Sequence, residues 1–128
     1  MFCNGVKMPK SSVLNLSSVV LAYIGDAFYT LYVRTKLVSQ SDCKANKLHD
    51  ECVKSVNANA QAEYVNKILP LLNGEETAVF MRARNTKKIN GTKCADNAAY
   101  SASTGFEAVL GYLYLLGETE RLERLLNV

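Results

Sequence analysis

One stretch near the N-terminus, residues 17–38, most constrains how this chain folds. It reads SSVVLAYIGDAFYTLYVRTKLV, and Asp26 is the only charged residue between Ser11 and Val33. Apolar residues recur at spacings of three and four, which is typical of an amphipathic helix, and the opposite face is hardly more polar. The expected stripe consists of Val20, Tyr23, Ile24, Ala27, Phe28, Leu31 and Tyr32. We therefore predict a central helix buried on nearly all sides, with Asp26 surrounded by protein or facing a groove. An ionised carboxylate there is unfavourable unless a cation, a metal or a hydrogen-bond donor compensates it.

A second apolar stretch, residues 101–117, repeats this pattern. It reads SASTGFEAVLGYLYLLG and carries one charge, Glu107. Each lone carboxylate has a glycine beside it: Gly25 precedes Asp26, and Gly105 lies two residues before Glu107. Glycine costs about 1 kcal/mol relative to alanine within a helix, so it is expected where another backbone, a ligand or a metal comes close. The sequence thus predicts two apolar helices that each present one acid.

The rest of the chain is also helical in pattern, and no alternating strand pattern is present. Asn73 or Gly74 is expected to cap a helix, and Pro70 and Gly117 are expected to end helices. The further helices are expected at 44–56, 58–69, 75–84, 98–116 and from 118 onward, after an irregular lead-in over 1–14. We predict a single all-α domain over 1–128, a compact bundle of five to seven helices.

Basic residues are concentrated between Glu76 and Asp96. The chain has a formal net charge of +3, and this segment contributes +5, which leaves −2 for the remainder. The segment carries Arg82, Arg84, Lys87, Lys88 and Lys93 without an acid. Part of it, residues 85–96, lacks periodicity and contains an Asn-Gly turn signal, so we predict a basic loop there. Such a segment indicates an anionic partner, although a solvated surface loop explains it as well.

Two acids on neighbouring buried helices cannot both stay charged without compensation. They can pair with a cation such as Arg82 or Arg84, share a proton, or hold Mg²⁺ or Mn²⁺ through their oxygen atoms. A divalent cation beside a basic loop suits activation of water for attack on a phosphodiester. The residues alone leave the metal site and an idle structural ion pair equally open.

Other residue types narrow the range of functions. The four cysteines form no C-x-x-C motif and His49 is the only histidine, so a structural zinc site is not expected. His49 is expected on a helix surface, with an auxiliary role as the alternative. Tyr100 follows the basic segment and is a second possible auxiliary residue. The chain shows no secretory signal and no run long enough to span a membrane, which favours a reduced cytoplasmic protein.

Four segments resemble a known family. LAYIGDAFYTLYVR (21–34) and STGFEAVLGYLYL (103–115) resemble the two carboxylate helices of ribonuclease III catalytic domains. LHDECVKSVNANAQA (48–62) and FMRARNTK (80–87) resemble the short bacterial branch called Mini-ribonuclease III. The similarity extends over residues 16–126, nearly the whole chain.

This resemblance implies a homodimeric, Mg²⁺-dependent endonuclease that cuts double-stranded RNA and leaves 5′-phosphate and 3′-hydroxyl ends. Asp26 and Glu107 match the metal-binding acids, with Mn²⁺ able to substitute. Full-length ribonuclease III has two further acids, at the positions of Ala22 and Thr104, and the short branch shares their loss, so one weakly held ion is expected. No double-stranded-RNA-binding domain like that of the longer enzymes is expected, so the 85–96 loop is expected to contact RNA.

The implied natural substrate is precursor 23S ribosomal RNA, whose ends are matured with the help of a ribosomal protein that shapes the substrate. Two competing readings remain. Ala22 and Thr104 favour a non-catalytic RNA-binding or scaffold protein built on the same domain. A helical protein with buried structural ion pairs is the other alternative, and it leaves the basic segment unexplained.

Overall fold

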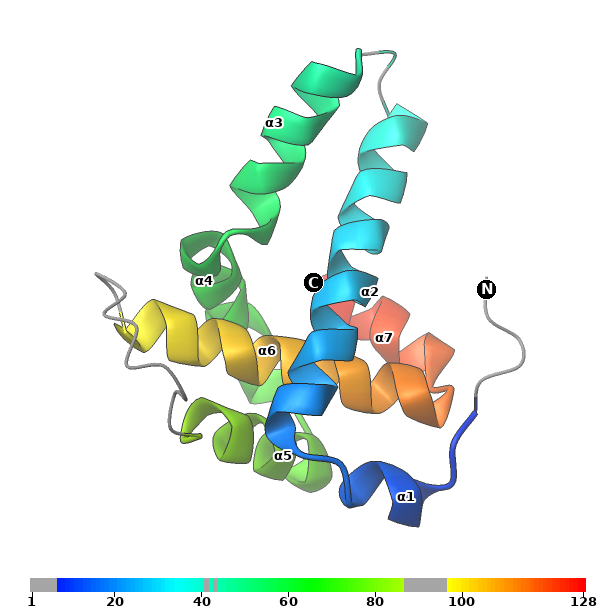
Figure 1. Cartoon of the computed structure of the whole chain (residues 1–128), viewed down its shortest axis with the longest axis vertical. Coiled ribbons are helices and arrows are strands. Elements are labelled where there is room, and N and C mark those ends of the chain that lie inside the picture. Colours follow the sequence, from blue (N-terminus) through cyan, green and yellow to red (C-terminus); the bar gives the residue numbers. More distant parts are fainter. Residues whose placement is uncertain (1–6, 41, 43, 87–96) are drawn as a thin grey trace.

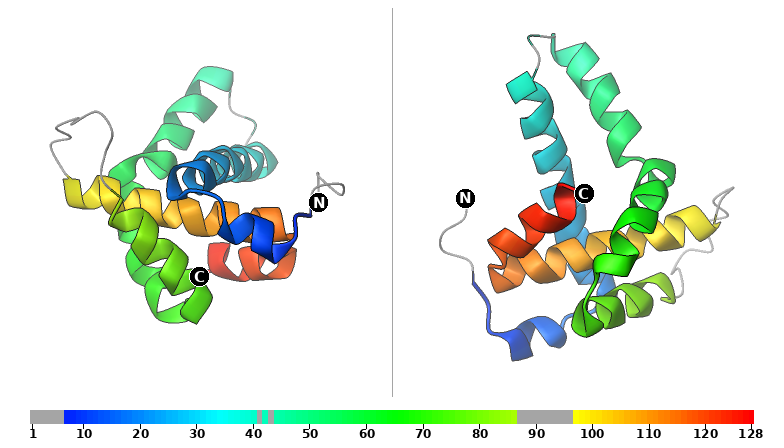
Figure 2. Two further views of the ribbon diagram at one scale, coloured as in Figure 1. Left: turned by 60° about the horizontal axis from the view of Figure 1, so that its bottom comes forward. Right: turned by 180° about the vertical axis from the view of Figure 1, so that it is seen from behind.

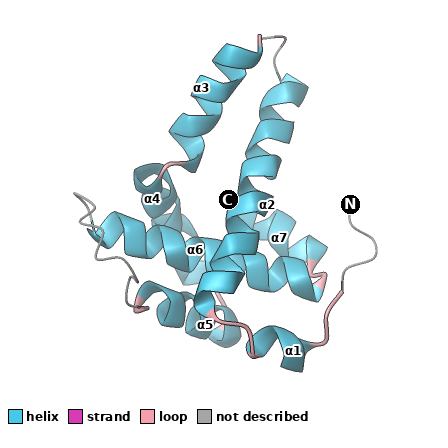
Figure 3. Ribbon diagram, in the orientation of Figure 1, coloured by secondary structure: helices cyan, strands magenta, loops and turns pink. Residues whose placement is uncertain are grey.

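A computed structural model describes residues 7–40, 42, 44–86 and 97–128. Every regular element in these ranges is a helix, as Figure 3 shows, which confirms the all-α prediction. None of these helices is long and apolar enough to cross a bilayer. In chain order the elements are α1 Lys10–Leu14, α2 Ser18–Gln40, α3 Ala45–Val56, α4 Ala58–Ile68, the short 3₁₀ helix η1 Leu69–Leu71, α5 Gly74–Arg84, α6 Asn97–Leu116 and α7 Thr119–Leu126.

Helix α6 lies at the centre of the molecule. It packs against α2, α4, α5 and α7, so that α2 crosses one face and the other helices cover the rest (Figures 1 and 2). Phe106, Ala108, Val109 and Leu110 in its middle are fully buried. A helix surrounded in this way is apolar on nearly every side, and the residue pattern of 101–117 predicted this correctly.

Two glycines let α2 and α6 approach until their backbones touch. A Cβ on Gly25 would overlap the backbone carbonyl of Glu107, and a Cβ on Gly111 would overlap the carbonyl of Leu21. Only glycine fits at such a crossing, because any side chain would separate the helices. The close approach predicted from Gly25 is therefore confirmed, and the approaching group is the backbone that carries Glu107.

Helix α2 is buried on one side only, which corrects the prediction of burial on nearly all sides. Its buried face consists of Ser18, Leu21, Ala22, Gly25, Tyr29 and Val33. The stripe expected to face the core is largely exposed instead: Val20 is 43%, Tyr23 is 75% and Leu31 is 44% exposed. The physical reason is the size of the side chains, because the face with alanine and glycine allows α6 to approach more closely than the aromatic face does.

The turn residues act as their chemistry predicts. Helix α4 ends at Ile68, and Pro70 lies in η1 directly after it. Asn73 caps α5: its side chain accepts a bond from the Glu76 N–H, and the Glu76 carboxylate accepts one from the Asn73 N–H, each at 2.9 Å. Gly117 ends α6 with a positive φ of 75°, a conformation that favours glycine.

Part of the predicted irregular lead-in over 1–14 is helical, whereas its first six residues lie outside the described residues. Residues 10–14 form α1, which follows Pro9, and Val13 is fully buried. The Met8 N–H also donates to the carbonyl of Leu115 at 2.8 Å, which joins this segment to the end of α6. Burial of Val13 explains the difference, because one anchored apolar residue holds a turn of helix that its short pattern does not reveal.

Candidate active site

Asp26 and Glu107 come together at the crossing of α2 and α6. Gly25 brings the two backbones into contact, and the side chains of the two acids form a hydrogen-bonding pair beside that contact. Asp26 is exposed, whereas Glu107 is partly buried. We call these two residues the carboxyl pair. Of the two settings expected for Asp26, its exposure excludes burial within protein, and it leaves one side of the pair open.

Aromatic packing fixes the three helices around the pair. Phe106, next to Glu107, makes edge-to-face contacts with Tyr29 of α2 and Tyr64 of α4, with ring centroids 5.0 and 5.7 Å apart. The Tyr64 hydroxyl donates to the carbonyl of Leu125 at 2.6 Å, which ties α4 to α7. Phe106, the neighbour of Glu107, is therefore held between α2 and α4, and such support is needed for a site with fixed geometry.

No ion pair between described residues compensates the negative charge of the carboxyl pair. Burial and, next in size, the neighbouring Asp26 carboxylate together raise the pKa of Glu107 from 4.5 to about 8, although the Gln61 amide acts to lower it. Ion pairs between described residues join Lys10 to Glu75, Lys54 to Glu51 and Arg121 to Glu76, and none of these involves the carboxyl pair. Without a cation, Glu107 keeps its proton at neutral pH.

Gln61 is a site residue that the sequence analysis missed. It lies on α4, is 1% exposed, and its Nε2 donates to the carbonyl of Val56 at 3.1 Å. Its Oε1 accepts a hydrogen bond from the hydroxyl of Ser103, and its amide also bonds to Glu107. The available signal is positional, because Gln61 occupies the inward register of α4 together with Val65 and Ile68.

The positions where full-length ribonuclease III is expected to have further acids contribute no carboxylate. Ala22 is buried in the α2 face that packs on α6, and the Thr104 hydroxyl donates to the carbonyl of Tyr100 at 3.0 Å. Over the described ranges, no group of three or more His, Cys, Asp or Glu residues is placed to hold a metal ion. Two adjacent carboxylates remain, and such a donor set fits one divalent cation that is completed by water and phosphate oxygens.

The two arginines predicted to bind RNA make different contacts within the protein. Arg82 donates from Nε to the Ser18 hydroxyl at 3.2 Å and from a terminal nitrogen to the carbonyl of Leu16 at 3.3 Å, so it ties α5 to the start of α2. Arg84 is exposed, and its Nε bonds to Asn85 at 3.4 Å. The three predicted lysines, Lys87, Lys88 and Lys93, lie outside the described residues.

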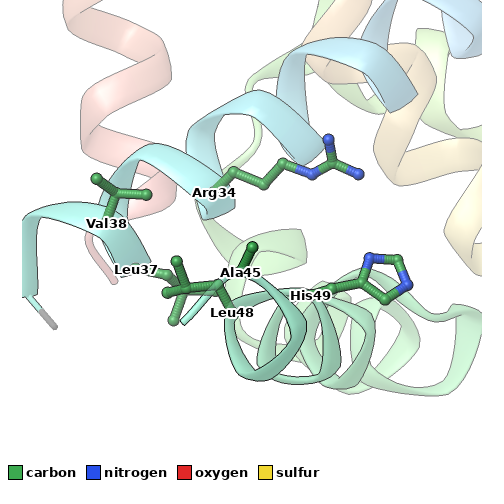
Figure 4. Close-up of a pocket in the computed structure, with 6 residues that line it drawn as sticks. All are labelled: Arg34, Leu37, Val38, Ala45, Leu48 and His49. Atoms are coloured by element: carbon green, nitrogen blue, oxygen red, sulfur yellow. The ribbon is translucent and has the colours of Figure 1, made fainter. Parts of the chain in front are cut away.

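The two auxiliary candidates lie in different places. Tyr100 is 41% exposed in the first turn of α6 and precedes Glu107 by seven residues, which is about two helical turns. His49 lies on α3 and lines a pocket of about 240 Å³ between α2 and α3, where its ring and the Arg34 guanidinium occupy the same end (Figure 4). The carboxyl pair does not line this pocket, so the structure does not bring His49 to it.

The raised pKa predicts how the stability of the metal-free chain depends on pH. Unfolded Glu107 ionises near 4.5, whereas folded Glu107 keeps its proton to about 8, beside Asp26 of α2 and the uncharged Gln61 of α4. Between these values the unfolded state binds fewer protons, so the free energy of unfolding is expected to fall as the pH rises from about 5 to about 8. Thermal melts without metal measure this loss. The free energy of unfolding of the Glu107→Gln variant should fall less than that of the wild type over the same pH range. Equal falls in the two proteins would contradict the raised pKa of Glu107.

Known proteins are similar to this chain over nearly its whole length, including both acids of the carboxyl pair. The ribonuclease III domain family matches residues 19–118, which include both carboxylates. Mini-ribonuclease 3 of Thermoanaerobacter sp. (strain X514) is 51% identical over 94% of this chain and 85% of its own length. Mini-ribonuclease 3 of Clostridium tetani is 43% identical over 97% of this chain and 83% of its own length. A crystal structure of a Fusobacterium nucleatum protein superposes with a TM-score of 0.80 at 28% identity, and the match covers 88% of this chain and 92% of that one.

Proposed function

Because this chain belongs to the ribonuclease III family, and within it to the Mini-ribonuclease 3 group, we propose that it hydrolyses double-stranded RNA with Mg²⁺ held by Asp26 and Glu107. Its family membership makes it an endoribonuclease, and the metal and the substrate are the parts proposed. The observation that supports the metal and the substrate is the carboxyl pair. It is open on the side of Asp26, and burial beside Asp26 raises the pKa of Glu107 to about 8.

Each acid has a distinct part in this proposal. Asp26 is exposed and would offer one oxygen ligand, and Glu107 in its ionised form would supply the other. When bound, Mg²⁺ lowers the pKa of water and offsets charge on the phosphate, and Mn²⁺ has the same chemistry. Because Ala22 and Thr104 bring no further carboxylate, one ion per site is proposed. The products are 5′-phosphate and 3′-hydroxyl ends.

The basic segment between α5 and α6 is proposed to hold the RNA. Double-stranded RNA is recognised mostly by its shape and its phosphate backbone. Arg84 is exposed at the end of α5, and the segment 85–96, with Lys87, Lys88 and Lys93, leads directly into the helix that carries Glu107. Arg82 contributes chiefly by fixing α5 to α2. Tyr100 is an auxiliary contact on the same helix as Glu107.

A second copy of this chain is proposed to cover the exposed face of α2. Val20, Tyr23 and Leu31 form an apolar surface there, next to a groove of about 180 Å³ lined by residues that include Phe28 and Tyr114. Apolar surfaces of this kind mark interfaces, and a two-fold dimer places the same face on both partners. Asp26 borders this face, so a dimer would bring two carboxyl pairs to one RNA.

The cellular role is proposed from the family alone. Maturation of 23S ribosomal RNA ends in the cytoplasm, with a ribosomal protein that shapes the precursor, is the role implied by the Mini-ribonuclease III resemblance. A non-catalytic RNA-binding scaffold is the second candidate, because Ala22 and Thr104 replace two acids. Preservation of Asp26 and Glu107 side by side favours the enzyme.

A cleavage assay tests the proposed function. End-labelled double-stranded RNA is expected to give discrete products with Mg²⁺ or Mn²⁺ and none with a chelator, while single-stranded RNA of the same sequence stays intact. Ion removal should leave binding to double-stranded RNA detectable as a gel shift. Products that form equally with chelator would contradict the metal site. Double-stranded RNA that is bound in the gel shift but not cut would favour the scaffold, provided that a ribosomal RNA precursor with its partner protein also stays uncut.

A further inference from the structure

We propose that Gln61 is a positioning residue that orients the Glu107 carboxyl group for the cation. This inference rests on the proposed function, because it concerns the metal site proposed there. Gln61 itself is not proposed to touch the RNA or the reacting water. It acts through Glu107, from inside the protein and from a third helix, α4.

Three helices meet at the Gln61 side chain. Ser103 and Glu107 are four residues apart on α6, so they lie one turn apart on the same helical face. Gln61 reaches that face from α4, bonding to the Ser103 hydroxyl and to the Glu107 carboxyl group. With an exposed fraction of 1%, the Gln61 amide is shielded from water that would compete for these bonds.

The bonding pattern fixes which way the Gln61 amide points. The carbonyl of Val56 can only accept, so the amide atom facing it is Nε2, and Oε1 faces the Ser103 hydroxyl and accepts from it. One N–H of Nε2 meets the carbonyl of Val56 at 3.1 Å at the end of α3. The other is available to the Glu107 carboxyl group. The opposite orientation would place Oε1 against the Val56 carbonyl, with two acceptors facing each other.

An amide donor held in this way restricts rotation of the Glu107 carboxyl group and favours its ionised form. Outer partners of this kind orient metal ligands, and their loss typically lowers metal affinity or activity by about 10- to 100-fold. The effect matters here because Ala22 and Thr104 supply no further carboxylate. With only two protein carboxylates available, the orientation of each contributes more to the affinity for the cation.

Two substitutions and one control test this role. Gln61→Leu keeps the bulk and removes the donor, and Ser103→Ala removes the hydroxyl that orients the amide. Val65→Ala, one turn along the same face of α4, shortens a buried side chain (3% exposed) that has no polar atom to bond Glu107. Calorimetric titration with Mn²⁺ measures metal affinity without RNA. Cleavage at varied Mg²⁺ separates the half-saturating ion concentration from the maximal rate.

Gln61→Leu is expected to bind Mn²⁺ about tenfold more weakly and to need about tenfold more Mg²⁺ for half-maximal cleavage. Its maximal rate at saturating Mg²⁺ should fall much less. Ser103→Ala should shift both quantities in the same direction by a smaller factor. Val65→Ala should melt at a lower temperature with its ion requirement unchanged, which separates orientation of Glu107 from general loss of stability.

The outcomes distinguish this inference from the proposed function. Unchanged ion affinity and ion requirement in Gln61→Leu, with an active wild-type enzyme, would overturn the role of Gln61 alone. If circular dichroism shows that Gln61→Leu does not fold, Ser103→Ala decides by the same criterion. A wild-type chain that binds Mn²⁺ and cuts no RNA would overturn the proposed function, while calorimetry would still decide the role of Gln61. A wild-type chain that neither binds Mn²⁺ nor cuts RNA would overturn both.

Discussion

Asp26→Asn is expected to abolish RNA cleavage and to leave the fold and RNA binding largely intact. Asparagine keeps the size of the side chain and removes the negative charge that would hold the cation. Asp26 is exposed, so the fold does not depend on that charge. Loss of the electrostatic stabilisation that a metal ligand supports should lower the single-turnover rate by about a thousandfold or more. Single-turnover cleavage at saturating Mg²⁺ and a gel shift measure the two properties separately.

A matched control for this substitution is Asp50→Asn. Asp50 is an exposed aspartate on α3, so this substitution removes the same charge at a position away from the carboxyl pair. The Asp50→Asn variant should cleave RNA at the wild-type rate. The Glu107→Gln variant should resemble Asp26→Asn, because each acid provides one of the two oxygen ligands. Substantial cleavage by Asp26→Asn would exclude this aspartate from the mechanism.

Gly25→Ala is expected to destabilise the protein by more than about 3 kcal/mol, at the upper end of what overpacking costs. The added Cβ would overlap the backbone carbonyl of Glu107, so α2 and α6 would have to separate along their whole crossing. Alanine is otherwise favoured over glycine within a helix by about 1 kcal/mol. The sign of the change therefore tests the contact itself, and urea denaturation followed by circular dichroism measures it.

Gly74→Ala provides the comparison for this change. A Cβ at Gly74, the first residue of α5, meets nothing within 4 Å. We expect its free energy of unfolding to be unchanged or slightly raised. If Gly25→Ala proved as stable as Gly74→Ala, α2 and α6 would have to cross farther apart, and the carboxyl pair would have to be arranged differently.

Several features of this protein follow from local chemistry that the sequence displays. Pro70, Asn73 and Gly117 end or begin helices because each restricts or satisfies the backbone within a few residues of itself. The two lone acids, each near a glycine in an apolar helix, indicated that their helices meet. The family resemblance, carried by the same residues, is confirmed by the match over 19–118.

Other features depend on which surfaces meet in three dimensions. Periodicity shows that both faces of α2 are apolar, but it does not tell which one packs on α6. The smaller face with Ala22 and Gly25 is buried, and the face with Tyr23 is exposed. Hydrophobicity alone favoured the wrong face, because the distance between two helices depends on side-chain volume.

The sequence by itself therefore determined the longer helices, the residues that begin or end several of them, and the two acids. Only the tertiary structure decided that Gln61 of α4 reaches Glu107, that Arg82 is bonded to the start of α2, and that burial beside Asp26 raises the pKa of Glu107 to about 8. Helix ends depend on neighbours along the chain, and these are visible in the sequence. Hydrogen-bond partners and pKa shifts depend on groups brought together from distant helices, and the packing around α6 fixes which groups those are.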